Sequence, residues 1–373
     1  MLLKYFGEKM KKYLFFSLIL VQILFAQNVT DIDKQACREL GISEFKLLEL
    51  KEKKIYEMSY GDLDLYLDYL DFTQPSLFKR VQTIAKKYIG QPYDLYNMGE
   101  FPFELYDSKN LVNLKSSDCV TFVESVMAMA LSYDWKSYFI MLQRIRYKNG
   151  NIGVAFRNHF SEVDWIPNNS WLARDITDNF DGVNTIKVHS KINKAGFLKR
   201  WGVNSPDNYI TADWSYIPNE EAPKIIPYLR TGDIVFFVKG FSPSNATITH
   251  VGLVSVEEDG VVNLIHSGKP QVQILPLIEY IRKWAPSVED DVAPALEQEF
   301  DEEILMNPQL NESEEKSSGG TKECDNKGRK KKIKKGSLKF LGIRVLRLNE
   351  NPIMNLEKID GPNAPKLTIY YYK

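Results

Sequence analysis

A cysteine stands at the predicted start of a helix in residues 116–124, which read SSDCVTFVE. Ser117 or Asp118 can cap this helix, and apolar residues recur behind Cys119 at steps of three and four residues. A helix N-terminus carries partial positive charge and unpaired backbone N–H groups, which favour a thiolate and can hold a developing oxyanion. Cys119 is therefore a candidate nucleophile. The competing interpretation is an inert thiol, because cysteine is one of the most frequently buried residue types.

Two histidines supply the partners that a thiolate nucleophile needs, a base within hydrogen-bond reach and a third group that fixes its tautomer. His250 lies in THVGLVSV and His266 in VVNLIHS, two strand-like runs separated by the turn sequence EEDG. Because antiparallel neighbours place such residues side by side, we predict His250 as the base and His266 as its orienting group. Either histidine alone would more often be structural. His159 and His189 lack this context, although His159 could reach a substrate from its loop.

Zinc binding is the alternative chemistry for one cysteine and two histidines. No two of Cys119, His250 and His266 lie within four residues of each other, and no carboxylate motif joins them. Such spacing is rare among zinc sites, so we predict no metal ion and no cofactor.

The sheet that would carry both histidines is predicted from runs rich in β-branched and aromatic residues. IVFFV, THVGLVSV, VVNLIHS and QVQIL follow one another between residues 234 and 275 and should form an antiparallel meander. KFLGIRVLRL, at 339–348, is expected to add one further strand. A helix capped by Ser76 and ended by Gly90 and Pro92 precedes the cysteine helix. The predicted fold class is α+β.

The chain divides into four predicted regions. Residues 1–26 place lysines before an apolar run and form an export signal, either cleaved after Ala26 or kept as an inner-membrane anchor. Residues 27–75 form a helical extension, and residues 76–286 with 337–373 form the catalytic domain. Residues 287–336 are an acidic and then basic insertion, expected to be disordered, for which a solvated loop is favoured over a partner-binding segment. We expect an exported, periplasmic monomer that meets the membrane only through an uncleaved signal.

The net charge and the number of cysteines limit the possible partners and disulfides of the chain. The 373 residues carry a net charge of −1, so we expect no nucleic-acid partner. Three cysteines leave at least one thiol unpaired. Cys37 and Cys324 lie in peripheral segments and could form a disulfide, although nothing in the sequence favours that pairing, and Cys119 is unpaired by default.

A polar and aromatic stretch, RNHFSEVDWIPNN at 157–169, shows little apolar periodicity. It is either a solvated surface turn or a loop that holds a polar ligand with sugar and carboxylate parts. The residue types that support the second interpretation are those of Arg157, Asn158, His159, Asp164 and Trp165.

The order DCVTF, GDIVFF, HVGLV and LIHS resembles the NlpC-type papain-like cysteine hydrolases of bacterial cell walls. With RYKNG, RNHFSEVDW and GIRVLR added, the chain more narrowly resembles the N-acetylmuramoyl-L-alanine amidase-like family. The likeness runs from about residue 77 to residue 348, apart from the insertion. It implies a papain-like NlpC-type α+β fold in which the nucleophile helix packs on an antiparallel sheet, with additional helical segments.

The resemblance also implies an activity and a site. Members of the family cleave the amide between the lactyl group of N-acetylmuramic acid and L-alanine in peptidoglycan or muropeptides, and some favour the anhydro form of the sugar. No cofactor is implied. The implied catalytic residues are Cys119 as nucleophile, His250 as base and His266 as orienting residue. Tyr93 is implied beside the nucleophile, and the rest of the implied muropeptide site consists of Arg157, Asn158, Asp164 and Trp165.

Two other functions stay open. An endopeptidase of the same class would cleave the stem peptide between D-glutamate and diaminopimelate, which the masses of the products distinguish from the amidase. A non-catalytic wall-binding module would contain an unreactive Cys119, which alkylation by iodoacetamide at mildly acidic pH would reveal.

Overall fold

The computed structural model describes residues 29–204, 208–284 and 338–361. The predicted signal at 1–26, the charged insertion at 287–336 and Cys324 lie outside these residues. Within the described ranges, no helix is both long and apolar enough to cross a membrane. Neither Cys37 nor Cys119 forms a disulfide with another described residue.

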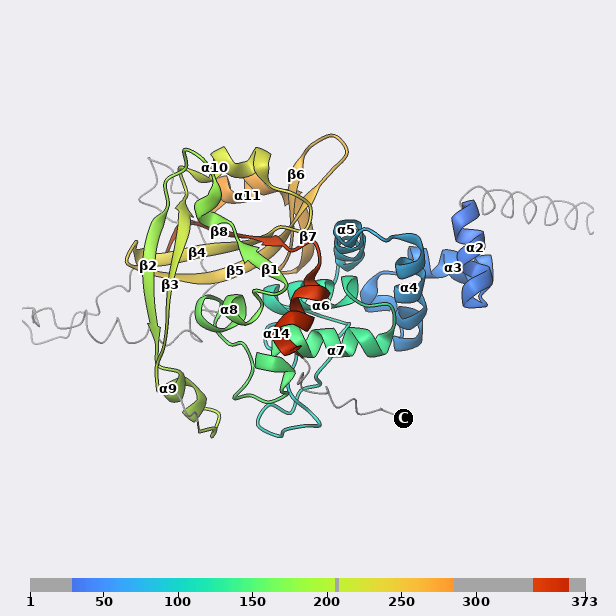
Figure 1. Cartoon of the computed structure of the whole chain (residues 1–373), viewed down its shortest axis with the longest axis horizontal. Coiled ribbons are helices and arrows are strands. Elements are labelled where there is room, and N and C mark those ends of the chain that lie inside the picture. The colour runs from blue at the N-terminus through green and yellow to red at the C-terminus, as the bar shows by residue number, and fades with distance from the viewer. Residues whose placement is uncertain (1–28, 205–207, 285–337, 362–373) are drawn as a thin grey trace, which may run out of the picture.

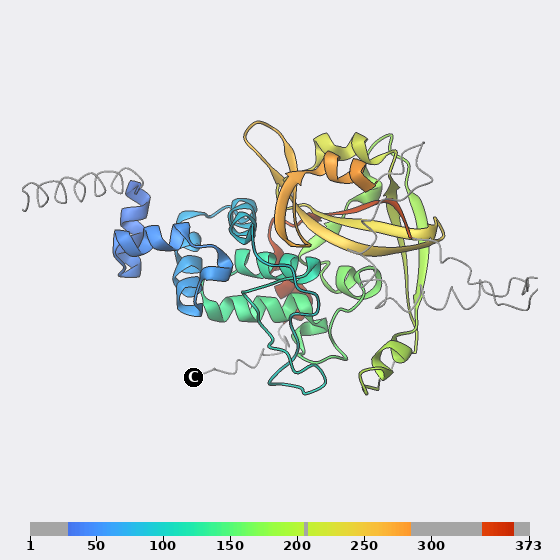
Figure 2. The same ribbon diagram turned by 180° about the vertical axis from the view of Figure 1, so that it is seen from behind.

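An antiparallel sheet of eight strands forms one side of the molecule, and helices form the other (Figures 1 and 2). Seven strands lie in the order β2–β3–β8–β4–β5–β6–β7, and β1 also pairs with β8. The strands are β1 (Ala173–Asp175), β2 (Ile186–Ile192), β3 (Ile210–Pro218), β4 (Ile234–Ser242), β5 (Asn245–Val256), β6 (Val262–Gly268), β7 (Gln271–Pro276) and β8 (Lys339–Leu348). The sheet confirms the predicted α+β class and the predicted meander from β4 to β7.

Strand β8 follows the insertion and rejoins the sheet between β3 and β4. It pairs with β4 in the register that sets Ile234 opposite Leu346, which confirms the expected extra strand. Strands β1 to β3 were not predicted. The buried face of β2 explains why, because it alternates Val188 and Ile192 with the polar Ser190, which accepts a hydrogen bond from the Trp214 indole at 2.9 Å. A buried serine hides the apolar alternation that marks a half-buried strand.

Three helices occupy the other side of the molecule: α5 (Leu77–Tyr88), α6 (Cys119–Ala130) and α7 (Trp135–Arg146). Helix α6 is buried along nearly its whole length, because it contacts α5, α7 and strands β5 and β6. Asp118 caps α6 by accepting a hydrogen bond from the Thr121 N–H at 2.8 Å. The cap fixes the position of the neighbouring Cys119 at the first turn.

The segment before α5 is helical and shares the apolar core of α5 to α7. It comprises α2 (Asp31–Leu40), α3 (Glu44–Glu52), η1 (Ile55–Glu57) and α4 (Tyr60–Thr73). Lys87 of α5 ties the two parts together, because its buried ammonium group donates to the carbonyl oxygens of Leu50 and Lys51 at 2.9 and 2.8 Å. These carbonyl groups lie in the last turn of α3, at the negative end of the helix dipole, where a cation is favoured.

Shorter elements complete the described chain. The stretch at 157–169, predicted as a loop, contains a π-helical turn and a short helix, a local distortion often found at functional sites. The elements are η2 (Lys148–Gly150), η3 (Ser161–Trp165), α8 (Ile166–Asn168), η4 (Thr177–Asn179), α9 (Lys194–Lys199), α10 (Ala222–Ile225), η5 (Ile226–Tyr228), α11 (Leu277–Trp284) and α14 (Pro352–Asp360).

Candidate active site

Cys119 is the first residue of α6 and lines a cavity of about 210 Å³. Its side chain is mostly enclosed, with the residue 4% exposed. His250, in the middle of β5, lines the same cavity. The fold thus places a helix-start cysteine and a strand histidine on the wall of one cavity, although they lie far apart in sequence.

His266 on β6 lies behind His250. The Nε2 atom of His250 is 2.8 Å from the Nδ1 atom of His266, and the two ring planes are nearly perpendicular. Gly252 makes this approach possible, because a Cβ atom there would lie only 3.0 Å from the Cβ atom of His266. The three residues predicted as nucleophile, base and orienting group are therefore brought together.

The hydrogen bond between the histidines fixes which nitrogen of His250 can act as a base. When the Nε2–H of His250 donates to Nδ1 of His266, the Nδ1 atom of His250 keeps its lone pair. Burial lowers the pKa of both rings, that of His266 to about 4 and that of His250 well below its usual value. Both imidazoles are consequently neutral near pH 7, and a neutral His250 can accept the proton of a thiol.

His266 should be replaceable by a hydrogen-bond acceptor but not by an apolar side chain. We expect His266→Asn to keep activity within about tenfold, whereas His266→Leu leaves the Nε2–H of His250 buried without a partner. Losing this hydrogen bond in His266→Leu should cost about 2 kcal/mol, which lowers kcat/KM roughly 30-fold. Steady-state kinetics on one muropeptide would measure both, with denaturation midpoints as the folding control. Equal activity of the two variants would contradict the orienting role.

A buried hydrogen-bond chain connects the segment before Cys119 to the strand of His266. The hydroxyl of Ser267 donates to the carbonyl oxygen of Ser117 at 2.8 Å, and the hydroxyl of Ser117 donates to the side-chain oxygen of Gln91. The amide of Gln91 in turn donates to the carbonyl oxygen of Leu114 at 2.9 Å. These bonds fix the segment that leads into Cys119 against the strand that carries His266.

Tyr93 lies next to this chain, with its backbone bridged to Ser117 and its N–H donating to the carbonyl oxygen of Pro270 at 3.0 Å. It is not among the residues that line the cavity, whereas Tyr96 is. Tyr96 adopts a backbone φ of 58°, a left-handed conformation that non-glycine residues seldom take outside constrained sites. Tyr96 is thus a cavity residue that was not predicted, and the expected place of Tyr93 beside the nucleophile stays a prediction.

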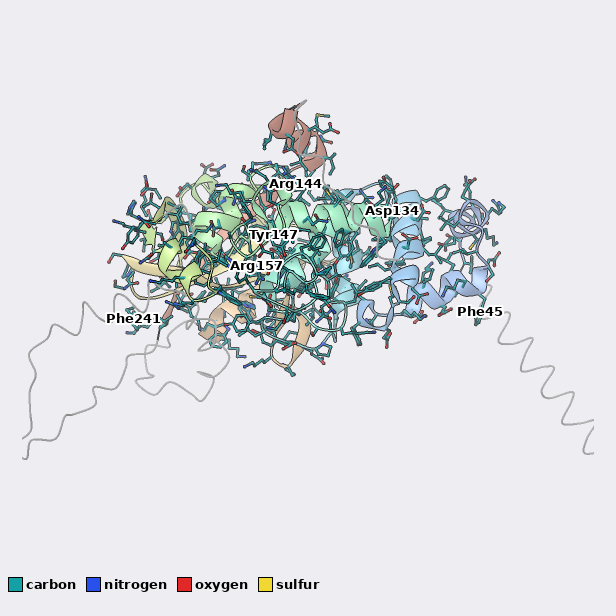
Figure 3. All side chains as sticks on the ribbon, turned by 90° about the horizontal axis from the view of Figure 1, so that it is seen from below. Phe45, Asp134, Arg144, Tyr147, Arg157 and Phe241 are labelled. Atoms are coloured by element: carbon teal, nitrogen blue, oxygen red, sulfur yellow. The ribbon has the colours of Figure 1, made fainter. Side chains whose placement is uncertain are left out.

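Arg157 and Asn158 line the cavity, as expected of substrate-site residues, but their polar groups already have protein partners. Arg157 pairs with Glu100 and, at 3.0 Å, with Asp107, and the hydroxyl of Tyr147 also donates to Glu100. Figure 3 labels Arg157 and Tyr147 among the side chains of the molecule. The side-chain amide of Asn158 donates to the carbonyl oxygen of Ile145 at 2.9 Å. Both residues shape the wall of the cavity.

Asp164 and Trp165 lie behind the wall and are not among the residues that line the cavity. Asp164 forms an ion pair with Lys194 at 2.9 Å. The Trp165 indole N–H donates to Glu124 at 3.0 Å, and its ring packs against Phe236. Their contacts in this structure support the π-helical turn that carries them.

Several cavity residues were not identified from the sequence, above all the buried ionisable groups Glu124, Arg146 and Glu162. Glu162 accepts hydrogen bonds from the Thr247 hydroxyl at 2.7 Å and from the Ile248 N–H at 3.3 Å. The only sequence signal for Glu124 is a carboxylate inside an otherwise apolar helix. Burial raises the pKa of Glu124 to about 7.

The raised pKa of Glu124 predicts a pH-dependent stability difference between the wild type and Glu124→Gln. The folded pKa lies above the ordinary value of 4.5, so the carboxyl group contributes stability below pH 4.5 that is lost as the pH rises through 7. Glutamine does not titrate and keeps an oxygen for Trp165. We expect Glu124→Gln to gain stability relative to the wild type by roughly 3 kcal/mol between pH 4.5 and pH 8. Urea unfolding at both pH values measures this gain, and a pH-independent difference would contradict it.

No described group of three histidine, cysteine, aspartate or glutamate residues is arranged to hold a metal ion.

Comparison with known proteins gives a family match and a shared fold. The model of the N-acetylmuramoyl-L-alanine amidase-like family matches residues 83–287, more than half of the chain. A crystal structure of a Legionella pneumophila protein, 17% identical, superimposes with a TM-score of 0.55 over 79% of this chain and 95% of that chain. A crystal structure of an N-acetylmuramoyl-L-alanine amidase from Bacteroides uniformis, 20% identical, superimposes with a TM-score of 0.47 over 73% of this chain and 99% of that chain. No curated protein matches the chain significantly.

Proposed function

The chain belongs to the N-acetylmuramoyl-L-alanine amidase-like family, and from that premise we propose that it is a cysteine hydrolase of peptidoglycan fragments. The bond cleaved is the amide between N-acetylmuramic acid, in its ordinary or anhydro form, and L-alanine. One observation carries the proposal: Cys119 at the start of α6 and His250 of the histidine pair line one cavity. The fold is proposed to be of the papain-like NlpC type, because α6 packs against the strands β5 and β6 that carry both histidines.

The proposed reaction proceeds through a thioester. The Nδ1 atom of His250 takes the proton of the Cys119 thiol as sulfur attacks the lactyl carbonyl carbon. The positive end of the α6 dipole stabilises the tetrahedral oxyanion, and each hydrogen-bond donor in comparable sites is worth about 3 kcal/mol. His250 then gives its proton to the amine of L-alanine as the C–N bond breaks. Water, deprotonated by His250, hydrolyses the thioester and releases the carboxylate of muramic acid.

The masses of the products test the proposed bond. A defined muropeptide should yield the free sugar and the intact stem peptide with an L-alanine amino terminus. An L-alanyl-D-glutamate stub left on the sugar would instead establish the endopeptidase activity. The reaction is proposed to take place in the periplasm, on the basis of the export signal predicted at 1–26, and secretion of a fusion carrying this segment would test that location.

A further inference from the structure

One buried cation in the cavity, Arg146, forms no ion pair with a described carboxylate. Arg146 is the last residue of α7, is 3% exposed and lines the cavity together with Cys119 and His250. The one hydrogen bond that its side chain makes within the described chain is a long one, from Nη1 to the carbonyl oxygen of Leu111 at 3.3 Å. A guanidinium group has five N–H donors, so most of the capacity of Arg146 is unused by the protein.

The other buried arginines nearby do have carboxylate partners. Arg144, two residues earlier on α7, pairs with Asp360 at 2.6 Å, and Arg157 pairs with Glu100 and Asp107. Among the described residues, no ion pair includes Arg146. The charge of Arg146 acts on Asp118 and Glu124, where it opposes the rise in pKa that burial causes, but neither carboxylate forms an ion pair with it. A buried guanidinium group without a directly bound carboxylate is costly, which favours a partner supplied by a ligand.

The two acids on which the charge of Arg146 acts, Asp118 and Glu124, accept their hydrogen bonds from other groups. Asp118 accepts from the N–H and hydroxyl of Thr121 to cap α6, and Glu124 accepts from the indole of Trp165. The fully enclosed polar atoms that lack partners include donors of Arg144 and Arg344 but none of Arg146. The remaining donors of Arg146 therefore open onto the cavity.

We propose that Arg146 binds a carboxylate of the stem peptide and so holds the leaving-group side of the substrate in this cavity. The inference rests on the proposed function, because the single carboxyl group of muramic acid is consumed in the scissile amide and only the peptide side still carries an anion. The nearest such group is the α-carboxylate of the second stem residue, D-glutamate, about 7 Å from the scissile bond in an extended chain. A guanidinium fork matches a carboxylate in two parallel hydrogen bonds.

The test compares two muropeptides that differ only at this α-carboxylate, one with the free acid and one with the carboxamide. Wild-type protein should favour the acid about 100-fold in kcat/KM, in line with a charged, bidentate contact. Arg146→Gln should bring this ratio near one, and Arg146→Lys should keep part of the preference. Arg144→Gln, on the same helix but paired with Asp360, is the matched control and should leave the ratio unchanged.

Two results would overturn the assignment. One is an equal wild-type kcat/KM on the acid and on the carboxamide. The other is an Arg146→Gln variant in which kcat/KM falls by the same factor on both muropeptides, so that their ratio stays as in the wild type. The wild-type ratio requires no variant and so stands even where Arg146→Gln fails to fold. Titration of both muropeptides into Cys119→Ala protein separates this proposal from the proposed function. A preference for the acid that Arg146→Gln removes would support carboxylate binding whichever bond the enzyme cleaves.

Discussion

Replacing Cys119 with serine should lower kcat/KM on a muropeptide by about 10⁴-fold or more, because loss of the proposed nucleophile would abolish the covalent pathway. Serine is close in size to cysteine, and its hydroxyl is far less acidic than a thiol. Cys119 belongs to the apolar core, but the cap from Asp118 that fixes its position does not involve the sulfur atom. The variant should therefore fold with an unchanged unfolding midpoint.

The assay for Cys119→Ser is the release of stem peptide from a defined muropeptide, followed by mass spectrometry. Cys37→Ser is a suitable control, because Cys37 is also buried but belongs to α2. We expect that control to keep full activity. Full activity of purified Cys119→Ser would remove the basis of the assigned mechanism.

Replacing His250 with glutamine lowers kcat by about 10³-fold, within the range that general acid–base catalysis supplies. Glutamine can still hydrogen-bond to His266, yet it cannot take the proton of a thiol or return one to the leaving amine. The reaction of Cys119 with iodoacetamide should slow in parallel near pH 7, since the neutral His250 no longer assists loss of the thiol proton.

The comparison that isolates proton transfer is His250→Gln against His266→Asn. The first should lose both turnover and alkylation rate, and the second should keep most of both. A His250→Gln variant with wild-type alkylation and turnover would show that another group deprotonates Cys119.

Much of the site could be predicted from local sequence because its parts depend on local rules. The Asp118 cap and the apolar spacing behind it define the start of α6, and the hairpin between β5 and β6 sets His266 beside His250. Strand β8 was also predicted, because its run of apolar and β-branched residues indicates a strand even though a long insertion separates it from the rest of the sheet.

The rest of the cavity depends on contacts between segments far apart in the chain. Arg157 binds Glu100 and Asp107, which lie 57 and 50 residues earlier, and no local pattern indicates that pairing. Arg146 and Glu124 sit on helices where a charged residue is ordinarily solvated, and only the packing of α6 against α7 and the sheet encloses them. The same limit applies to Tyr96, because its place in the cavity follows from the path of a loop.

The most direct test of the account is the mass of a covalent intermediate. Wild-type protein mixed with a defined muropeptide, quenched in acid during the first turnover and digested, should yield a modified peptide that contains Cys119. The expected mass gain equals that of the muramoyl acyl group alone, joined to Cys119 as a thioester. A gain that includes L-alanine and D-glutamate, or turnover without any adduct on Cys119, would contradict it.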